Sequence, residues 1–534
     1  MQGMNGKLCQ VVAAAFAVGL VFSGEAAEPR RRGFDKPLVI VADDFGAFFK
    51  DEKNEMTKAG LEAYADGILA GGKVTHVFWC PVAGRANFDA KATEPIWAGL
   101  GNPATEWGVL KNENGVARAT EPAELAANRR WAENAKKLAD AGIDPYRVWI
   151  DRTREKGASP WISIRMGDTQ CCFFPNHFRT PAYFAQHREL LLTTRCHGAG
   201  AVNYAFPESR AWFTRVVRET AARYKDVDGI EIDIETQNFY VLGSTVPPGA
   251  IPPPNAEPPY VVFAKYLKEL KDEIAEASGN RTIKLALRVI SDTNLLFAHF
   301  GGPVDGFPVD LLIPAYGDSR CPGGLIADWA DRDRYYRRRR IVPNVSVGGL
   351  TAPQIAGRLG NVRGREFPGV MLSGIEKTIP PVRKAILVDG LADIKKGVRG
   401  PCDIHLPQDQ HLMAWKRAAW GYVDCRLNFP WALDKSFKGE FALQDGFAAE
   451  KGVVATVFYD CPDIPETVYL NGRKPQTCKK AGKTATYVFP KDAVFGSVNQ
   501  FYIPAEKPET LELDNGTAPR KPTSVLGVNV RIDM

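Results

Sequence analysis

An alternation of isoleucine and acidic residues at positions 228–235 constrains the fold of this chain more than any other feature. The segment reads Asp-Gly-Ile-Glu-Ile-Asp-Ile-Glu. Successive side chains of a β-strand point to opposite faces, so Glu231, Asp233 and Glu235 share one face and the isoleucines share the other. Burying an unpaired carboxylate is very costly. The segment therefore predicts a strand whose acids point into a barrel interior or its mouth, with partners on neighbouring strands.

Apolar runs alternate with helical patterns from about residue 36 to 435, which favours a parallel α/β architecture. Helical spacing or composition is present at 121–141, 208–224 and 261–277. The proline-rich stretch 242–259 is too long for a simple turn, so we expect a loop over the site. Eight strand candidates fit a (β/α)8 TIM-type barrel, at 38–42, 74–79, 161–166, 229–235, 284–289, 311–316, 341–347 and 422–429.

The last part of the chain, residues 436–534, has a different pattern. Its short alternating segments are separated by Gly, Pro, Asn and Lys, which predicts a small all-β domain, a β-sandwich. The candidate strands lie at 453–459, 467–470, 484–489 and 528–532.

The beginning of the chain has the pattern of a secretory signal. Lys7 precedes an apolar stretch at 8–22 and a zone of mostly small residues, so we predict a signal peptide over 1–27 with cleavage after Ala26. An uncleaved anchor helix is the alternative, since a spanning helix needs about 20 apolar residues. No later segment is long and apolar enough to span a membrane. We expect a secreted or periplasmic protein, free of the membrane after cleavage.

The 534 residues include ten cysteines. Export implies an oxidising compartment, where disulfides form. Cys461 and Cys478 are candidate partners, and Cys171, Cys172 and Cys196 could supply one bridge, but the pairing cannot be deduced from sequence. Metal ligation is the rival interpretation, although no spacing resembles a zinc site. We expect no metal and no cofactor.

The net charge of +6 is mild. The densest basic run, 337–340, follows mixed charges at 331–334 and is typical of a solvated helix end. No nucleic-acid-binding motif accompanies it, so we expect no nucleic-acid partner. A mildly basic surface would suit an acidic glycan, and the oligomeric state stays open.

Two arginines are placed to neutralise the acidic face. By the same alternation, Arg165 in the strand at 161–166 and Arg288 in the strand at 284–289 point inward on either side of the acids. Buried acids need such paired charge. Glu231 lies deepest and is the natural arginine partner, whereas Asp233 and Glu235 lie nearer the mouth.

This arrangement suits glycoside hydrolysis, which needs two acidic groups of different protonation. Neighbouring like charges raise one pKa and keep that acid protonated at neutral pH. We predict Glu235 as the general acid and Asp233 as nucleophile or stabiliser. The alternative is an ion-pair network that only fixes the barrel.

Other polar residues at predicted strand ends are weaker candidates, because functional groups of such barrels gather there. Asp43 and Asp44 end the first strand. Glu231, Arg165 and Arg288 are predicted to support the catalytic pair, together with Asp168. The predicted substrate-binding residues are Asp292, Tyr316, Asn428 and Trp431.

The spacing Asp228-Gly-x-x-x-Asp233-x-Glu235 resembles the fourth-strand motif of glycoside hydrolase family 18 chitinases, Asp-Gly-x-Asp-x-Asp-x-Glu. The resemblance implies that Glu235 is the acid and that Asp233 orients the substrate's N-acetyl group. Glu231 departs from the motif, because that family has Asp there.

A broader resemblance covers about residues 36–435. The segments WISIRMGD (161–168), VDGIEID (227–233) and YVDCRLNFP (422–430) resemble the bacterial glycosyl-hydrolase-like family 10 barrel proteins. Proteins of that family are secreted and often carry a C-terminal β domain. The segment TVYLNG at 467–472 resembles the strand-and-turn pattern of that domain. Gly167 replaces the usual Asn of that family, so any amide role is lost. The resemblance implies a barrel and a glycan.

Three functions are in competition. The first is a secreted hydrolase of a poly- or oligosaccharide, and the second is a non-catalytic carbohydrate-binding barrel. The third is a metal-dependent polysaccharide deacetylase, because VIVADDFG (39–46) resembles the first metal motif of the chitooligosaccharide deacetylase family. That family also needs two later histidines, and only His76 is conveniently near. Loss of Glu235 would abolish turnover but spare binding in a hydrolase, whereas a binding protein would show no turnover.

Overall fold

The computed structural model describes most of residues 37–532, and no helix in the described part is long and apolar enough to cross a membrane. The predicted signal segment and positions 242–256 of the predicted loop lie outside it. The gaps are 102–106, 113–114, 116, 168, 193–200, 235–256, 291–295, 297–299, 301–303, 317–328, 330–340, 364–366, 392–401, 406–413, 419–420, 426–430, 433–435, 443–448, 450, 461, 463–464, 466, 495–497 and 506–522.

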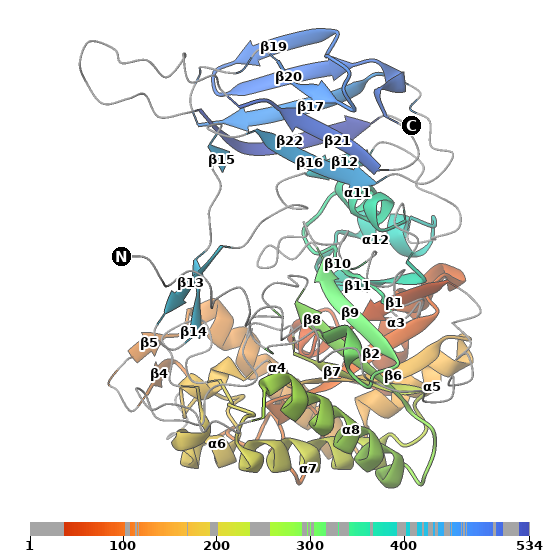
Figure 1. The fold of residues 1–534 in the computed structure, drawn as a ribbon. Helices are drawn as coiled ribbons and strands as arrows, with labels where there is room; N and C mark the ends of the chain where they lie inside the picture. Colours follow the sequence, from red (N-terminus) through yellow and green to blue (C-terminus); the bar gives the residue numbers. More distant parts are fainter. Residues whose placement is uncertain are drawn as a thin grey trace, which may run out of the picture. The chain divides into compact units, whose positions relative to one another are not determined.

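Eight parallel strands close into a barrel, which confirms the predicted fold class (Figure 1). The strands are β1 (Leu38–Ala42), β2 (His76–Ala83), β6 (Ser159–Arg165), β7 (Gly229–Asp233), β8 (Lys284–Ile290), β9 (Leu311–Tyr316), β10 (Asn344–Ser346) and β11 (Gly369–Ser373). Their order is β1-β11-β10-β9-β8-β7-β6-β2, and β2 pairs back to β1. The short strand β3 (Arg85–Ala86) extends β2 in the antiparallel sense.

Helices connect the strands, and the three helices predicted from sequence are confirmed. They are α4 (Pro122–Asp140), α7 (Pro207–Arg223) and α8 (Pro259–Ala277), each with a proline in its first turn, where the missing N–H costs nothing. α7 packs against α8. The other α-helices among the described residues are α2 (Ala47–Lys50), α3 (Lys58–Leu69), α5 (Pro145–Glu155), α6 (Ala182–Gln186), α11 (Ala352–Arg363) and α12 (Pro380–Leu387).

The barrel interior is built in layers of inward-pointing side chains. In the lowest layer, Trp161 of β6 stacks on Phe78 of β2 with ring centroids 4.8 Å apart. Gly229 of β7 makes room for this indole, because a Cβ on it would lie 2.3 Å from the Trp161 ring. Glu231 and then Asp233 form the layers above, since alternate residues of a strand face the same side. A side chain at position 229 would clash with Trp161, so this position requires glycine.

The prediction for the eighth barrel strand is wrong. The segment 422–429 was expected to close the barrel, but β14 (Gly421–Cys425) pairs with β13 (Ala414–Ala418) in an antiparallel ribbon. β11 (Gly369–Ser373) fills the eighth position between β10 and β1. Residues 422–429 and Gly369–Ser373 both have patterns that are compatible with a strand. Sequence pattern alone does not identify the strand with which each of them pairs.

The C-terminal strands form separate antiparallel sheets, consistent with the predicted β domain. The strands 453–459 and 484–489 are confirmed as β17 (Val453–Tyr459) and β20 (Thr484–Phe489), and the other two predicted segments contain β18 (Tyr469–Leu470) and β22 (Ser524–Ile532). One sheet joins β17, β20 and β22 to β12 (Cys402–His405), β15 (Trp431–Ala432) and β19 (Thr477–Ala481). A second sheet joins β18 to β16 (Phe437–Ala442) and β21 (Val498–Ile503).

Both sheets contribute to one core. Phe489 of β20 and Phe501 of β21 are fully buried, and their ring centroids lie 6.2 Å apart. β12 and β15, which precede residue 436, pair with β22 in the first sheet. The sandwich arrangement and the boundary at 436 stay predictions. The remaining described strands, β4 (Val109–Lys111) and β5 (Ala117–Ala119), form a hairpin.

Candidate active site

A buried ion pair occupies the middle of the barrel. Glu231 on β7 accepts two hydrogen bonds from Arg288 on β8, with Nε to Oε1 at 2.9 Å and Nη2 to Oε2 at 2.7 Å. The Glu231 side chain is 0% exposed and the Arg288 side chain 6%. A two-point pair of this kind satisfies both groups, as a buried carboxylate requires. The arginine partner predicted for Glu231 is confirmed.

Asp233 lies one layer nearer the carboxyl ends of the strands. The register places it beside Arg165 of β6 and Arg288 of β8. Its Oδ2 lies 3.9 Å from Arg165 Nε and 3.6 Å from Arg288 Nη1, and its side chain is 0% exposed. The two predicted inward arginines therefore do flank the described acids of this strand.

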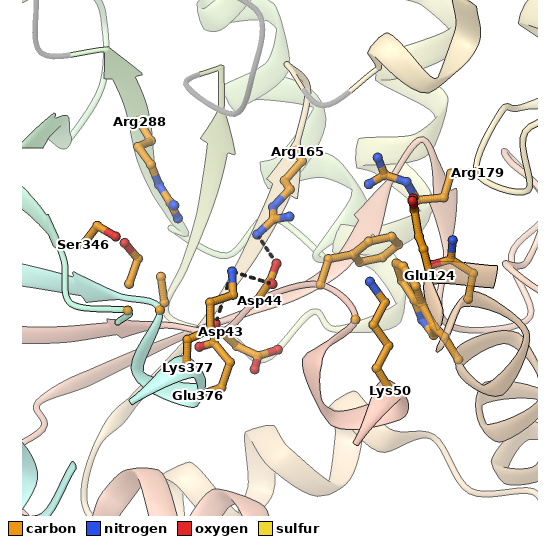
Figure 2. A pocket seen from close by; sticks show the side chains of 18 of the residues that line it. Asp43, Asp44, Lys50, Glu124, Arg165, Arg179, Arg288, Ser346, Glu376 and Lys377 are labelled. Carbon is orange, nitrogen blue, oxygen red and sulfur yellow. Dashed lines mark hydrogen bonds and ion pairs between the residues drawn. The ribbon is translucent and has the colours of Figure 1, made fainter. Parts of the chain in front are cut away.

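The chain of charges continues to the mouth of the barrel through Asp44, which follows β1. Arg165 Nη2 donates to Asp44 Oδ1 at 2.9 Å, and Lys377 Nζ lies 3.5 Å from Asp44 Oδ2 (Figure 2). Burial opposes ionisation of Asp44, but the charges of Arg165 and Lys377 outweigh it and lower the pKa of this carboxyl below its usual value. Asp44 is thus ionised at neutral pH.

The preceding residue, Asp43, has the opposite environment. It is 6% exposed, and its Oδ1 accepts a hydrogen bond from the Tyr64 hydroxyl of α3 at 2.8 Å. Burial raises the pKa of Asp43 well above its usual value, and the nearby charges of Glu376 and Asp44 raise it further. A neutral phenol does not compensate a charge as an arginine does. The pKa values of two consecutive carboxyls are therefore displaced in opposite directions by their surroundings.

A third acid, Glu376, lies on the short 3₁₀ helix η6 (Ile375–Lys377) that follows β11. Gly374 has φ 76°, a left-handed conformation that glycine adopts without strain, and this turn directs the helix to the mouth. Burial, followed by the charge of Asp44, raises the pKa of Glu376. Its Oε1 is buried and accepts no hydrogen bond from a described residue, although Lys377 Nζ lies 3.7 Å away.

These acids border a cavity of about 390 Å³ at the carboxyl ends of the barrel strands (Figure 2). That volume lies within the ordinary range for small-ligand sites. Asn344 at the start of β10 also lines the cavity, and its buried Oδ1 has no hydrogen-bond partner among the described residues. Unsatisfied buried polar groups are rare in folded proteins and are costly. A ligand with hydroxyl groups could satisfy Asn344 and Glu376 together.

Several predicted site residues cannot be placed against this cavity. Tyr316 is the last residue of β9, as predicted. Trp431 was expected at the end of the eighth barrel strand, and this is wrong, because β15 pairs with β22 in the C-terminal sheet. Four more predicted residues lie outside the described part of the chain: Glu235, Asp168, Asp292 and Asn428.

Sequence reasoning missed Glu376 and Lys377 altogether. The missing signal was the strand before them, because residues that follow a barrel strand are functional candidates only once that strand is recognised. Asp43 and Asp44 were noted as the end of β1, but their contrasting environments depend on side chains from α3, β6 and η6.

The metal site of the alternative deacetylase function would need Asp43, Asp44 and His76 close together, and the described structure does not bring them together. His76 is the first residue of β2 and pairs in register with Ile40, whereas Asp43 follows the end of β1. Its ring contacts Trp161 in the lowest layer, with centroids 6.1 Å apart. Within the described residues, no three His, Cys, Asp or Glu side chains are arranged to hold a metal ion.

Four described cysteines are free: Cys80, Cys171, Cys172 and Cys478. Cys171 and Cys172 are free and buried, whereas Cys478 is free and exposed. Their suggested partners Cys461 and Cys196 lie outside the described residues. The structure thus gives no bridge between Cys171 and Cys172, and the other pairings stay predictions.

No protein-family model and no curated protein sequence matches this chain. Among solved structures, the PgaB (BpsB) glycoside hydrolase domain from Bordetella bronchiseptica is similar at a TM-score of 0.43 and 10% identity, over 66% of this chain and 98% of that one. A Group IV chitinase from Ostrinia furnacalis gives 0.35 at 12% identity, over 67% and 100% of the two chains. An alpha-L-fucosidase from Bacteroides thetaiotaomicron gives 0.34 at 8% identity, over 88% and 93%.

The fold and the site define a TIM-type barrel protein with acids and basic side chains gathered at the carboxyl ends of its strands. Functional groups of such barrels lie at this face.

Proposed function

We propose that this protein hydrolyses a glycosidic bond of a poly- or oligosaccharide at the carboxyl-end mouth of the barrel, with carboxyl groups as acid and base. One observation carries the proposal: Asp43, Asp44 and Glu376 line a single cavity in contrasting environments. Asp44 is held by Arg165 and Lys377, Asp43 is bound to a phenol, and Glu376 keeps an unpartnered oxygen.

Glycoside hydrolysis requires one protonated and one ionised carboxyl on either side of the scissile bond. Environments that push neighbouring pKa values apart supply such a pair. Glu376 suits the acid, because its pKa is raised and it borders the cavity. Asp44 suits the ionised role, in which it attacks the sugar, activates water or stabilises positive charge.

The strand motif supports a second assignment of the same roles. There Glu235 is the acid and Asp233 the nucleophile or stabiliser, with Glu231, Arg165 and Arg288 as supporting residues. In this assignment Glu376 and Asp44 bind substrate. Asp168, Asp292 and Tyr316, at or just after the ends of β6, β8 and β9, keep their proposed roles around the sugar.

Turnover of a broad glycan and aryl-glycoside panel tests the proposal. We expect Glu376→Gln to reduce kcat by about 10²–10⁴-fold, the usual contribution of a general acid, and to retain glycan affinity. Glu62→Gln is the matched control, because Glu62 is on the surface of α3 and pairs with Lys58 of the same helix. Far-ultraviolet circular dichroism verifies that each variant is folded.

Glu235→Gln and Asp233→Asn separate the two assignments. Loss of turnover in Glu235→Gln with normal turnover in Glu376→Gln would select the strand-motif pair. Absence of turnover in the wild type, with measurable glycan binding, would overturn the hydrolase in favour of a carbohydrate-binding barrel.

We also propose that the protein is exported. The support is the sequence pattern of residues 1–27. Mass spectrometry of protein recovered from outside the cytoplasm tests this, since cleavage after Ala26 gives a chain that begins at Ala27. A chain that retains Met1 would contradict cleavage.

A further inference from the structure

A second cavity lies between the helices α3 and α12, on one side of the barrel (Figure 1). Its volume is about 540 Å³, whereas the cavity at the barrel mouth, the mouth cavity, has about 390 Å³. It is lined by residues of α3, of the loop 53–55 before that helix, of η6 and of α12. Exposed residues of α3 run along it, so it is a groove open to solvent, and we call it the α3–α12 groove.

The α3–α12 groove and the mouth cavity share part of their wall. Asp43 and Glu376, two of the acids of the proposed reaction, line both of them. Tyr64, whose hydroxyl donates to Asp43, lines the groove as well. A group bound in the groove therefore lies next to the acids of the mouth, on the side away from the rest of the mouth cavity.

The part of α3 that lines the groove consists mostly of small residues, Ala59, Gly60, Ala63 and Gly67. The fold requires Gly60, because a Cβ there would lie 2.1 Å from the backbone oxygen of Glu55. Packing does not require Gly67, because a Cβ at this position would meet no atom within 4 Å. Glycine is a poorer helix former than alanine. The effect of Gly67 is thus to keep the groove open.

Hydrogen-bond donors and acceptors border the groove together. Arg383 of α12 donates from Nη2 to the backbone oxygen of Glu376 at 3.0 Å, and its buried Nε has no hydrogen-bond partner among the described residues. Lys53 and Glu55, which are exposed and of opposite charge, also line the groove. A hydroxyl group both donates and accepts hydrogen bonds. A neutral ligand with several hydroxyl groups therefore suits this mixed lining better than an ion of either sign.

We infer that the α3–α12 groove is a second subsite, which binds a neutral sugar unit of the glycan. Hydroxyl groups of the sugar bind Arg383 and Asp43, and the apolar face of its ring lies on Ala63 and Gly67. This inference rests on the proposed function, because it adds a subsite for the same class of substrate. A sugar in the groove also excludes water from one side of Asp43 and Glu376, which favours the protonated forms of these acids.

Calorimetry on the full chain tests the subsite. The probes are uncharged oligosaccharides of glucose, galactose, mannose and N-acetylglucosamine. Ala63→Leu and Gly67→Leu each add a side chain to the lining of the groove, and neither position lines the mouth cavity. We expect each variant to bind the oligosaccharide that the wild type prefers at least about tenfold more weakly, because about one hydrogen bond and part of the apolar contact are lost.

A control variant separates filling of the groove from a general effect of a larger side chain. Ala126→Leu is matched, because Ala126 is an exposed alanine of α4 that lines neither cavity, and we expect it to bind like the wild type. Leucine is a strong helix former, so all three variants should fold, which far-ultraviolet circular dichroism verifies. Wild-type affinity in both Ala63→Leu and Gly67→Leu overturns the subsite, as does an absence of binding by every probe.

The two proposals fail separately. Oligosaccharide binding that is weakened in Ala63→Leu and Gly67→Leu, without turnover of any probe, would support the subsite and reject the hydrolase. Turnover that requires Glu376, with the same oligosaccharide affinity in the groove variants as in the wild type, would support the hydrolase and reject the subsite.

Discussion

The acids in the middle of the barrel and the acids at its mouth are surrounded in different ways. Glu231 is fully buried, and both of its oxygens are matched by Arg288. At the mouth, Glu376 has an oxygen without a hydrogen-bond partner in the described structure, and Asp43 is matched only by a tyrosine. The sequence presents Glu231 inside one predicted strand and Asp43 at the end of another, whereas the strand before Glu376 was not recognised.

The difference shows which acids can take part in chemistry. A carboxylate whose hydrogen bonds are complete has no capacity left for a ligand, and breaking its pair is strongly unfavourable. A carboxyl whose environment raises its pKa can give a proton and take it back near neutral pH. We therefore place structural support in the middle of the barrel and reactivity at its mouth.

The largest expected effect is on stability, and it separates the two regions directly. Glu231→Gln should lower the free energy of unfolding by about 3–5 kcal/mol, because Arg288 is left buried without its main counter-charge. Glu376→Gln should change it by less than about 1 kcal/mol, because glutamine resembles the protonated acid. Urea unfolding followed by tryptophan fluorescence measures both, since Trp79, Trp149 and Trp161 are buried in the barrel.

A double variant sharpens this test. Replacing Glu231 and Arg288 together by methionine should recover part of the lost stability, because the apolar pair buries no charge of its own. Asp233 then keeps Arg165 at 3.9 Å but loses Arg288, so the recovery is incomplete. Similar losses for Glu231→Gln and Glu376→Gln would mean that the mouth acid is as structural as the interior one.

The next effect concerns two adjacent residues of the mouth with opposite environments. Asp44 has a lowered pKa in the folded state, so it stabilises the fold above its unfolded pKa, and this contribution is lost as pH falls through the folded value. Asp43 has a raised pKa, so its contribution is present below its unfolded pKa and is lost as pH rises through the folded value.

Substitution should therefore act with opposite signs at neutral pH. Asp44→Asn should destabilise the protein at pH 7, whereas Asp43→Asn should stabilise it, because the raised pKa of Asp43 means that its ionised form opposes folding at that pH. The Asp43→Asn difference should shrink as the pH falls towards 4, whereas the Asp44→Asn difference should persist there and shrink only at more acidic pH, because the folded pKa of Asp44 lies below its usual value. Urea unfolding across a pH series measures them, and effects of the same sign at pH 7 would refute the assigned environments.

Much of the barrel could be predicted because its strands carry strong local patterns. The Ile-acid alternation of β7 and the apolar run of β1 need no knowledge of their neighbours. β11 was missed because its local pattern is ambiguous. Gly369–Ser373 is a short apolar run that resembles a helix segment as much as a strand. Only the closed sheet shows that this run, and not 422–429, lies beside β1.

The candidate site could be predicted where partners lie on neighbouring strands and not where they lie on loops. Glu231 and Arg288 were paired from alternation alone, because alternation points both side chains into the barrel. The register places Arg288 beside Asp233, and its side chain reaches one layer down to Glu231. Arg179 and Glu376, which both line the mouth cavity, belong to a loop and a 3₁₀ turn, which have no periodicity that specifies where their side chains meet.

Replacing Lys377 should have the smallest effect on stability of these variants, but it should clearly shift the pH dependence of catalysis. Lys377 is 66% exposed and lies 3.5 Å from Asp44, so Lys377→Met should change the free energy of unfolding by less than about 1 kcal/mol. Its charge nevertheless helps to hold the pKa of Asp44 down. Removing it should shift the acidic limb of the pH profile of kcat/KM to higher pH, because Asp44 then loses its charge earlier as the solution is acidified. Lys58→Met, on the surface of α3, should leave the profile unchanged, and an unshifted acidic limb in Lys377→Met would show that Asp44 is not the ionised group of the reaction.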